Sequence, residues 1–169
     1  MYKVAKVVDS EWLTELYEDF KSGAMPSKPG AMSDPLAKNH AHYGDARKCT
    51  VMYTPVRLWP EIAKQIEDFV GDGSKVNQFD YILYKEGDWF TKHNDVGVSF
   101  PDRKWTTVTL IDLSDDYEGE GLCLYNGEEE VFPEMSIGDT ILFESRVYHE
   151  ARPVKKGTRL VLVAWLIST

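Results

Sequence analysis

The sequence predicts a mainly β fold, a sandwich or barrel of strands with helices laid on one face. Helical patterns come first, over residues 10–20 and 60–70, and a series of short β-prone runs follows Gly73. Helices that precede many short strands separated by turn signals are typical of this architecture. A chain of 169 residues suits one domain, with residues 1–75 as helical and loop support and residues 76–169 as the β core.

Both helices have recognisable ends and one apolar face. Ser10 can cap the first helix, and Pro60 and Gly71 suit the first turn and the end of the second. The apolar faces consist of Trp12, Leu13, Leu16, Tyr17 and Phe20 in the first helix, and Ile62, Ile66, Phe69 and Val70 in the second. Residues 21–49 between them predict a long loop, which in a compact domain is usually functional or disordered.

The β-prone runs are separated by turn residues. They cover Asn77–Tyr84, Trp105–Leu113, Gly121–Tyr125, Glu129–Phe132, Thr140–Phe143, Glu150–Pro153 and Thr158–Ile167. Asn126-Gly127 is the strongest hairpin signal of the chain.

The last of these strands alternates between two apolar faces. Arg159, Val161, Val163 and Trp165 form one face, and Leu160, Leu162, Ala164 and Leu166 form the other. A strand that is apolar on both faces is covered on both sides. The single charge, Arg159, therefore needs an anionic partner to offset the cost of burial.

The charge and cysteine content of the chain limit the classes of partner and compartment that suit it. The formal net charge of −9 disfavours nucleic acid and suits a basic polypeptide or a small molecule. The two cysteines, Cys49 and Cys123, predict inert buried thiols in a reducing compartment. The start of the chain shows no apolar signal core, and the run 160–167 is too short to span a bilayer, so we expect a cytoplasmic protein without a membrane segment.

Two histidines and an aspartate predict a metal site. In "DWFTKHNDVGVSF", His93 and Asp95 are two residues apart, which places both on one face of a strand. This pair alone is more often a surface hydrogen bond, but His149 supplies a third ligand. Two histidines and one carboxylate form the facial triad of non-haem Fe(II) oxygenases, and Arg159, ten residues after His149, can bind a carboxylate through two hydrogen bonds.

Four motifs in order carry a family resemblance. They are "YKEGDWFTKHND", "LIDLSDDYEGEGLCLY", "IGDTILFES" and "HEARPVKKGTRLVLVAWL". From about Asp80 to the C-terminus, the chain resembles the Fe(II)- and 2-oxoglutarate-dependent dioxygenases, and within them the prolyl 4-hydroxylase-like group. The resemblance implies a double-stranded β-helix, or jelly roll, with the N-terminal helices packed on its major sheet.

The resemblance also implies roles for single residues. His93, Asp95 and His149 match the iron ligands, and Arg159 matches the residue that binds the distal carboxylate of 2-oxoglutarate. Tyr84 and Trp165 match aromatic residues beside that pocket, although each is also explained by core packing. Asp112 stands near a position where some relatives have a carboxylate-binding tyrosine, and Phe90 stands where relatives often have tyrosine.

The implied reaction uses Fe(II), 2-oxoglutarate and O2 to hydroxylate a C–H bond, with succinate and CO2 as co-products. We expect the substrate to be a prolyl residue in a polypeptide. The alternatives are a free amino acid or small metabolite, nucleic-acid demethylation, and a non-catalytic metal-binding jelly roll. The net charge and Trp165, where nucleic-acid demethylases have a further arginine, argue against demethylation, and Arg159 argues against a mere metal holder.

Two other features remain open. His40 and His42 could form a second metal site, but no further ligands surround them in the sequence, and a solvated loop explains them better. The acidic residues of segment 115–130 suit solvated turns, or attract a basic substrate. The sequence predicts no oligomeric state.

Overall fold

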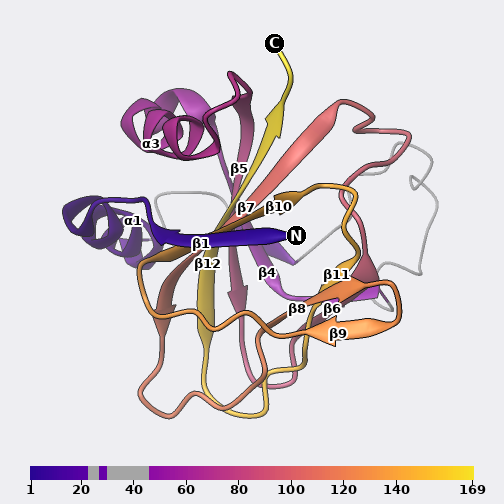
Figure 1. The fold of residues 1–169 in the computed structure, drawn as a ribbon. Coiled ribbons are helices and arrows are strands. Elements are labelled where there is room, and N and C mark those ends of the chain that lie inside the picture. The colour runs from indigo at the N-terminus through magenta and orange to yellow at the C-terminus, as the bar shows by residue number, and fades with distance from the viewer. Residues whose placement is uncertain (23–26, 30–45) are drawn as a thin grey trace.

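The protein is described from a computed structural model, which places residues 1–22, 27–29 and 46–169. Its strands form two antiparallel sheets, with seven strands in the order β1-β10-β7-β12-β5-β4-β2 and five in the order β3-β6-β11-β8-β9. Figure 1 shows the smaller sheet on one side of the larger one and both main helices on the other side. The expected mainly β fold with helices on the major sheet is confirmed.

The bounds of the elements are as follows. The larger sheet contains β1 (Tyr2–Lys6), β2 (Ser27–Pro29), β4 (Thr50–Thr54), β5 (Lys75–Tyr84), β7 (Arg103–Leu113), β10 (Asp139–Glu144) and β12 (Arg159–Ile167). The smaller sheet contains β3 (Arg47–Lys48), β6 (Trp89–His93), β8 (Leu122–Asn126), β9 (Glu129–Val131) and β11 (His149–Ala151). The helices are α1 (Ser10–Ser22), the short 3-10 helix η2 (Val56–Leu58) and α3 (Pro60–Val70).

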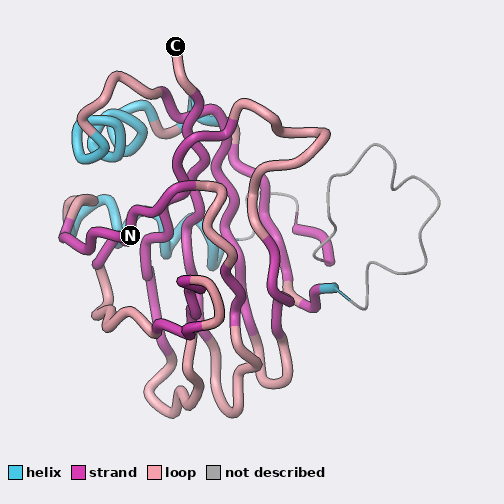
Figure 2. The backbone as a smooth tube through the Cα atoms, turned by 45° about the vertical axis from the view of Figure 1, so that its right-hand side comes forward, coloured by secondary structure: helices cyan, strands magenta, loops and turns pink. Residues whose placement is uncertain are grey.

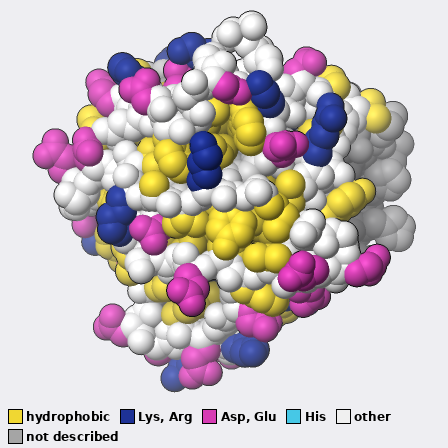
Figure 3. Space-filling view, in the orientation of Figure 1, with side chains coloured by type: hydrophobic (Ala, Val, Ile, Leu, Met, Phe, Trp, Pro, Cys, Tyr) yellow, Lys and Arg dark blue, Asp and Glu magenta, His cyan; other side chains and the backbone are white. Residues whose placement is uncertain are grey.

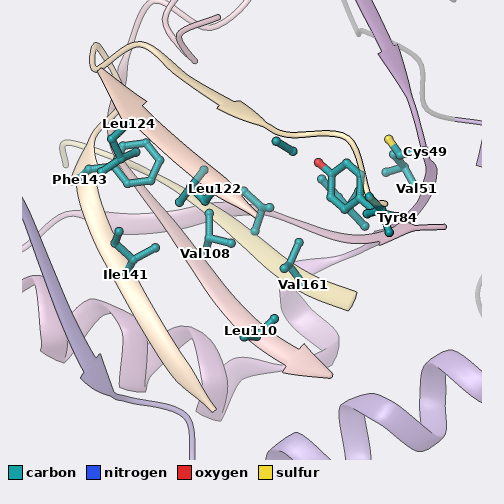
Figure 4. Packing of buried hydrophobic residues seen from close by; sticks show 14 of the residues in the cluster. Cys49, Val51, Tyr84, Val108, Leu110, Leu122, Leu124, Ile141, Phe143 and Val161 are labelled. Atoms are coloured by element: carbon teal, nitrogen blue, oxygen red, sulfur yellow. The ribbon is translucent and has the colours of Figure 1, made fainter. Parts of the chain in front are cut away.

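Strand β12 divides the interior into two apolar clusters, as its alternation predicts. Leu160, Leu162, Ala164 and Leu166 pack in an outer cluster with Leu16 of α1 and Ile62 and Ile66 of α3. Val161, Val163 and Trp165 belong to an inner cluster between the two sheets. Figure 4 shows side chains of this inner cluster, among them Tyr84 at one end and Phe143 at the other. The functional candidates lie at this inner face.

Both helices occupy the expected positions. Helix α1 begins at Ser10 and runs two residues beyond the expected end, to Ser22. Helix α3 has Pro60 in its first turn and is terminated by Gly71, the residue after Val70, whose φ of 75° is the left-handed conformation that glycine adopts without a steric cost. Among the described residues, no helix is long and apolar enough to cross a membrane.

The N-terminal part supplies strands as well as helices and loop. Strand β1 pairs with β10, and β3 and β4 pair with β6 and β5. These pairings join segments far apart in the sequence, so local patterns do not reveal them. Of the expected loop over residues 21–49, the tube in Figure 2 shows a short strand at β2, while residues 23–26 and 30–45 are drawn in grey. His40 and His42 lie outside the described residues.

The predicted hairpin joins β8 to β9, with a shifted turn. Asn126 pairs with Glu129, so the two turn residues are Gly127 and Glu128. Gly127 has a φ of 64° and takes the first turn position. The hairpin is therefore confirmed, but Asn126 is the last residue of the strand and not part of the turn.

The surface shows no single dominant charge on the face drawn in Figure 3. Apolar side chains gather there and are interspersed with acidic and basic ones. The described apolar residues that are exposed include Tyr2 and Val4 of β1, together with Phe132 and Ile137.

Candidate metal centre

The smaller sheet brings the two histidines together. His93 is the last residue of β6 and His149 the first of β11, and the two are register partners in this antiparallel pair. Their ring centroids lie 4.3 Å apart. Strand pairing therefore unites two side chains that are distant in the sequence, as the predicted metal site requires.

Asp95 reaches the same point from outside the strand, which corrects the prediction that His93 and Asp95 share a strand face. Strand β6 ends at His93, and Asp95 lies in a bend whose backbone N–H donates to the carbonyl oxygen of Ser145 at 2.9 Å. Its Oδ1 lies 3.6 Å from Nε2 of His93, and its Oδ2 lies 3.5 Å from Nε2 of His149. A backbone contact with the end of β10, and not strand alternation, aims this carboxylate.

Each imidazole is oriented by a backbone carbonyl. Nδ1 of His93 is 2.7 Å from the carbonyl oxygen of Thr91, and Nδ1 of His149 is 2.9 Å from that of Val147. A carbonyl oxygen only accepts, so Nδ1 carries the proton in both neutral rings. The lone pair is then on Nε2, the atom that faces Asp95, which is the arrangement of a metal-binding histidine.

Asp95 has a buried hydroxyl partner that the sequence analysis missed. The hydroxyl of Thr106 on β7 donates to Oδ2 of Asp95 at 2.6 Å and lies 3.0 Å from the hydroxyl of Ser145. Thr106 and Ser145 are almost completely buried. These hydroxyls hold the carboxylate in place, and no sequence motif distinguishes them from other buried threonines and serines of a sheet.

Electrostatics keeps Asp95 and His149 deprotonated. Burial favours the neutral form of Asp95, but the neighbouring His149 and His93 and the Thr106 hydroxyl outweigh it and hold the pKa of Asp95 well below its usual range. Burial also lowers the pKa of His149, and this effect is larger than the opposite effect of the negative charge on Asp95. A carboxylate and a neutral imidazole are the forms that bind a metal ion.

The three side chains fit a divalent transition metal. Their donor atoms all lie within 4.8 Å of one another. Adjacent ligands of an octahedral ion, at about 2.1 Å from the metal, are separated by about 3 Å, so a small inward adjustment closes the site. Two imidazoles and one carboxylate leave further positions free, as in Fe(II) oxygenases.

A cavity of about 50 Å³ adjoins the three side chains. Its walls include the triad, Tyr84, Phe90, Arg47, Arg159 and Trp165, with Val108, Leu122, Val161 and Val163 as apolar lining. The structure therefore brings together all six residues predicted from the sequence for metal and co-substrate. Tyr84 belongs to both the inner cluster and the cavity wall, so core packing and a pocket role do not exclude each other.

Arg159 is a buried cation without a protein counter-ion among the described residues. It is 6% exposed, and none of their carboxylates lies within 4.0 Å of it. Burial lowers its pKa, an effect opposed by Tyr84 and Tyr117. The guanidinium lies 5.7 Å from the centre of the Tyr84 ring. The expected anionic partner is therefore one that a ligand can supply.

A buried arginine outside the cavity wall, Arg103, contacts Trp165 and was not predicted. The guanidinium of Arg103 lies 4.1 Å from the centre of the Trp165 ring and 3.7 Å from that of Phe100. Its Nη2 donates to Oε1 of Gln78 at 2.8 Å. Burial lowers the pKa of Arg103 to about 10, so it remains a cation at neutral pH. This stack fixes Trp165 against the cavity.

Two positions depart from the family pattern. The ring of Phe90 stacks on His93, with centroids 3.7 Å apart, and so buttresses the imidazole without a hydrogen bond. Asp112 faces away from the cavity, because it pairs with Leu160 of the outer cluster. A bulge at this pairing leaves Ile111 unpaired and shifts the alternation by one residue. Asp112 therefore has no part in the site.

Comparisons with known proteins agree with this geometry. Residues 79–167, just over half of the chain, match the model of the 2OG-Fe(II) oxygenase superfamily. A PKHD-type hydroxylase of Gloeothece citriformis is 29% identical over 97 residues, which are 56% of this chain and 44% of the relative. A PKHD-type hydroxylase of Idiomarina loihiensis is 28% identical over 86 residues, which are 50% of this chain and 39% of the relative. The chain thus spans less than half the length of these curated relatives.

Solved structures share the fold. A Pseudomonas putida prolyl-4-hydroxylase superimposes with a TM-score of 0.71 and 15% identity, over 99% of this chain and 92% of the other. A prolyl hydroxylase of Trichoplax adhaerens, solved in complex with a hypoxia inducible factor peptide fragment, gives a TM-score of 0.71 and 16% identity, over 99% and 83%. At such identities the likeness extends to the fold alone.

Proposed function

The chain belongs to the 2OG-Fe(II) oxygenase superfamily, as its motifs predict, and from this premise we propose that it hydroxylates a prolyl residue in a polypeptide. Family membership confirms the predicted cofactors, Fe(II) and 2-oxoglutarate. The observation that carries the proposal is the placement around one cavity of the three ligand atoms and of the buried Arg159, which has no counter-ion among the described residues.

In this proposal His93, Asp95 and His149 hold the metal ion. Bound iron and 2-oxoglutarate together supply the oxidation of an unactivated C–H bond, with O2 consumed and succinate and CO2 formed. Arg159 holds the distal carboxylate through charge-assisted hydrogen bonds. The apolar walls Val108, Leu122, Val161 and Val163 keep bulk water from the reacting atoms.

Three observations support a polypeptide substrate. The curated relatives named above are PKHD-type hydroxylases, and both solved structures named above are prolyl hydroxylases, one of them in complex with a peptide fragment. The hairpin region carries exposed acidic residues, Glu118, Glu120, Glu128, Glu129 and Glu130, which suit a substrate with lysine or arginine near the target. The net charge of −9 makes a nucleic-acid substrate a poor alternative.

A substrate panel tests the proposal. The Fe(II)-loaded protein is incubated with 2-oxoglutarate, O2 and either proline-containing peptides or free amino acids, and succinate and one-oxygen mass gains are measured. We expect peptides to stimulate succinate formation and to gain one oxygen on proline, and the His149→Ala variant to do neither. If free amino acids gain oxygen and peptides do not, the polypeptide assignment is wrong and the small-molecule alternative replaces it.

A further inference from the structure

A bulge in β6 places Phe90 and His93 on the same face of the smaller sheet. Residues three apart in a regular strand point to opposite faces. In β6, however, Phe90 pairs with Ala151 and His93 pairs with His149, so three steps along β6 oppose two steps along β11. The extra residue reverses the alternation, and both rings line the cavity beside the metal ligands. The stacking of Phe90 on His93 therefore depends on this bulge.

Phe90 also contacts a cation from the N-terminal part of the chain. Arg47 of β3 is the register partner of Phe90, and its guanidinium carbon lies over the ring, 4.3 Å from the centroid. The imidazole of His93 is stacked on the same ring, with an interplanar angle of 19°. Both groups lie over the ring at contact distance, so they occupy its opposite faces. Phe90 is thus held between the guanidinium and the imidazole.

Arg47 is itself held in place. It is 8% exposed, and its Nε donates to Sγ of Cys49 at 3.2 Å. Burial raises the pKa of the Cys49 thiol, which is therefore protonated at neutral pH and accepts this bond as a neutral group. A guanidinium is planar and stacks on an aromatic face, unlike the compact ammonium of lysine. Arg47 therefore supports the face of Phe90 that points away from His93.

The stack restricts a movement of His93 that its hydrogen bond leaves possible. The bond between Nδ1 and the carbonyl oxygen of Thr91 fixes the tautomer and one atom of the ring. The imidazole can still tilt about that atom, and the tilt moves Nε2, the atom that faces Asp95. A flat ring stacked on the imidazole limits the tilt. Binding sites require their ligand atoms to be held within about 0.5 Å of the productive geometry, so this restraint favours metal binding.

We propose that Arg47 is a positioning residue of the metal centre, which holds Phe90 against His93 and thereby fixes this ligand. The inference rests on the proposed metal site and goes beyond it, because Arg47 is not one of the metal donors and acts through the Phe90 ring. A residue of the N-terminal part of the chain thus contributes to metal binding by the β core.

A double-mutant cycle on Co(II) binding tests this role. Co(II) can occupy an Fe(II) site of this kind, and its visible absorption depends on the positions of its ligands. Arg47→Lys keeps the positive charge, and with it the repulsion of a divalent ion, but loses the planar stack and the bond to Cys49. We expect Co(II) affinity to fall about 3-fold in Arg47→Lys and about 10-fold in Phe90→Leu, with an altered Co(II) spectrum in both.

The combined variant tests whether Arg47 acts through the ring. If it does, Arg47→Lys has no further effect once residue 90 is leucine, and the double variant is expected to match Phe90→Leu in affinity and spectrum. Lys48→Met is the matched control, because it changes the neighbouring residue of β3, whose side chain is 66% exposed and does not line the cavity. This control is expected to bind Co(II) as the wild type does.

Two results would overturn the role of Arg47 and leave the metal site intact. One is a wild-type affinity and spectrum in Arg47→Lys. The other is an equal loss from Arg47→Lys in the wild type and in Phe90→Leu, which would show that Arg47 acts independently of the ring. If the wild-type protein binds no Co(II), the proposed metal site fails and the role of Arg47 fails with it.

Discussion

His93 and His149 are direct partners across the β6–β11 strand pair, with Nδ1 of each bonded to a backbone carbonyl and Nε2 of each facing Asp95. The pairing fixes the spacing of the two rings, and the carbonyls fix their tautomers. The metal site is thus built mainly by backbone geometry.

The first prediction concerns the metal ligands. His149→Ala and Asp95→Ala each remove one of three donors, and we expect the affinity for Mn(II) to fall at least 100-fold by calorimetry. The fold should persist in circular dichroism, because the apolar clusters remain. Asp102→Ala is the control, since Asp102 is exposed and outside the site. Wild-type affinity in His149→Ala would show that the ion binds elsewhere.

A second prediction concerns the support of Asp95. Thr106→Val keeps the side-chain volume but removes the hydroxyl that donates to Oδ2 of Asp95. We expect Mn(II) affinity to fall about 10-fold. This is the lower end of the range typical for the loss of a hydrogen-bond partner of a metal ligand. Thr109→Val is a matched control, because it removes a buried hydroxyl that bonds to Thr140 away from the site. Equal Mn(II) affinities in the two variants would contradict a supporting role for Thr106.

A third prediction separates co-substrate from metal. Arg159→Ala removes the buried guanidinium that we propose as the partner of the ligand carboxylate, and we expect a cost of about 2–5 kcal/mol in 2-oxoglutarate binding. Mn(II) affinity is expected to change little, because Arg159 is not one of the metal donors. Arg159→Lys keeps the charge but loses the bidentate geometry, so an intermediate affinity is expected. A variant that binds 2-oxoglutarate as wild type does would make Arg159 a structural residue.

The fourth prediction is a pH dependence of stability. Burial lowers the pKa of His149 below its usual value of 6.5. Just below pH 6.5, His149 is therefore protonated in the unfolded chain but still neutral in the folded protein. In the metal-free protein this stability is present above pH 6.5 and is lost as the pH falls through the lowered pKa. We expect urea denaturation to show a decline below about pH 6.5 that is smaller in His149→Asn. Parallel pH profiles of the two proteins would exclude His149 as the cause.

Structure and site residues could be predicted from the sequence where a pattern repeats along one strand or matches a known motif. The alternation of β12 and the order of His93, Asp95 and His149 belong to this class. The sequence did not predict the position of a side chain where that position depends on contacts between segments far apart in the chain. Asp95 is aimed by a contact between its backbone N–H and the carbonyl oxygen of Ser145, a residue 50 positions later in the chain.

The register of β7 could not be predicted from the sequence, because it depends on a bulge that forms where β7 pairs with β12. The bulge opposite Leu160 interrupts the period of two, so Ile111 and Asp112 do not follow the alternation of the residues before them. Strand β1 was missed because its short run of mostly exposed residues shows no buried face, and it is held by pairing with the distant β10.

The most direct test of the account is the visible absorption spectrum of the anaerobic Fe(II) protein during titration with 2-oxoglutarate. We expect a new band that saturates at one equivalent, is absent in His149→Ala, and requires more 2-oxoglutarate in Arg159→Ala. A wild-type protein that develops no band, or a His149→Ala variant that develops the same band, would contradict the assignment of the iron and 2-oxoglutarate site.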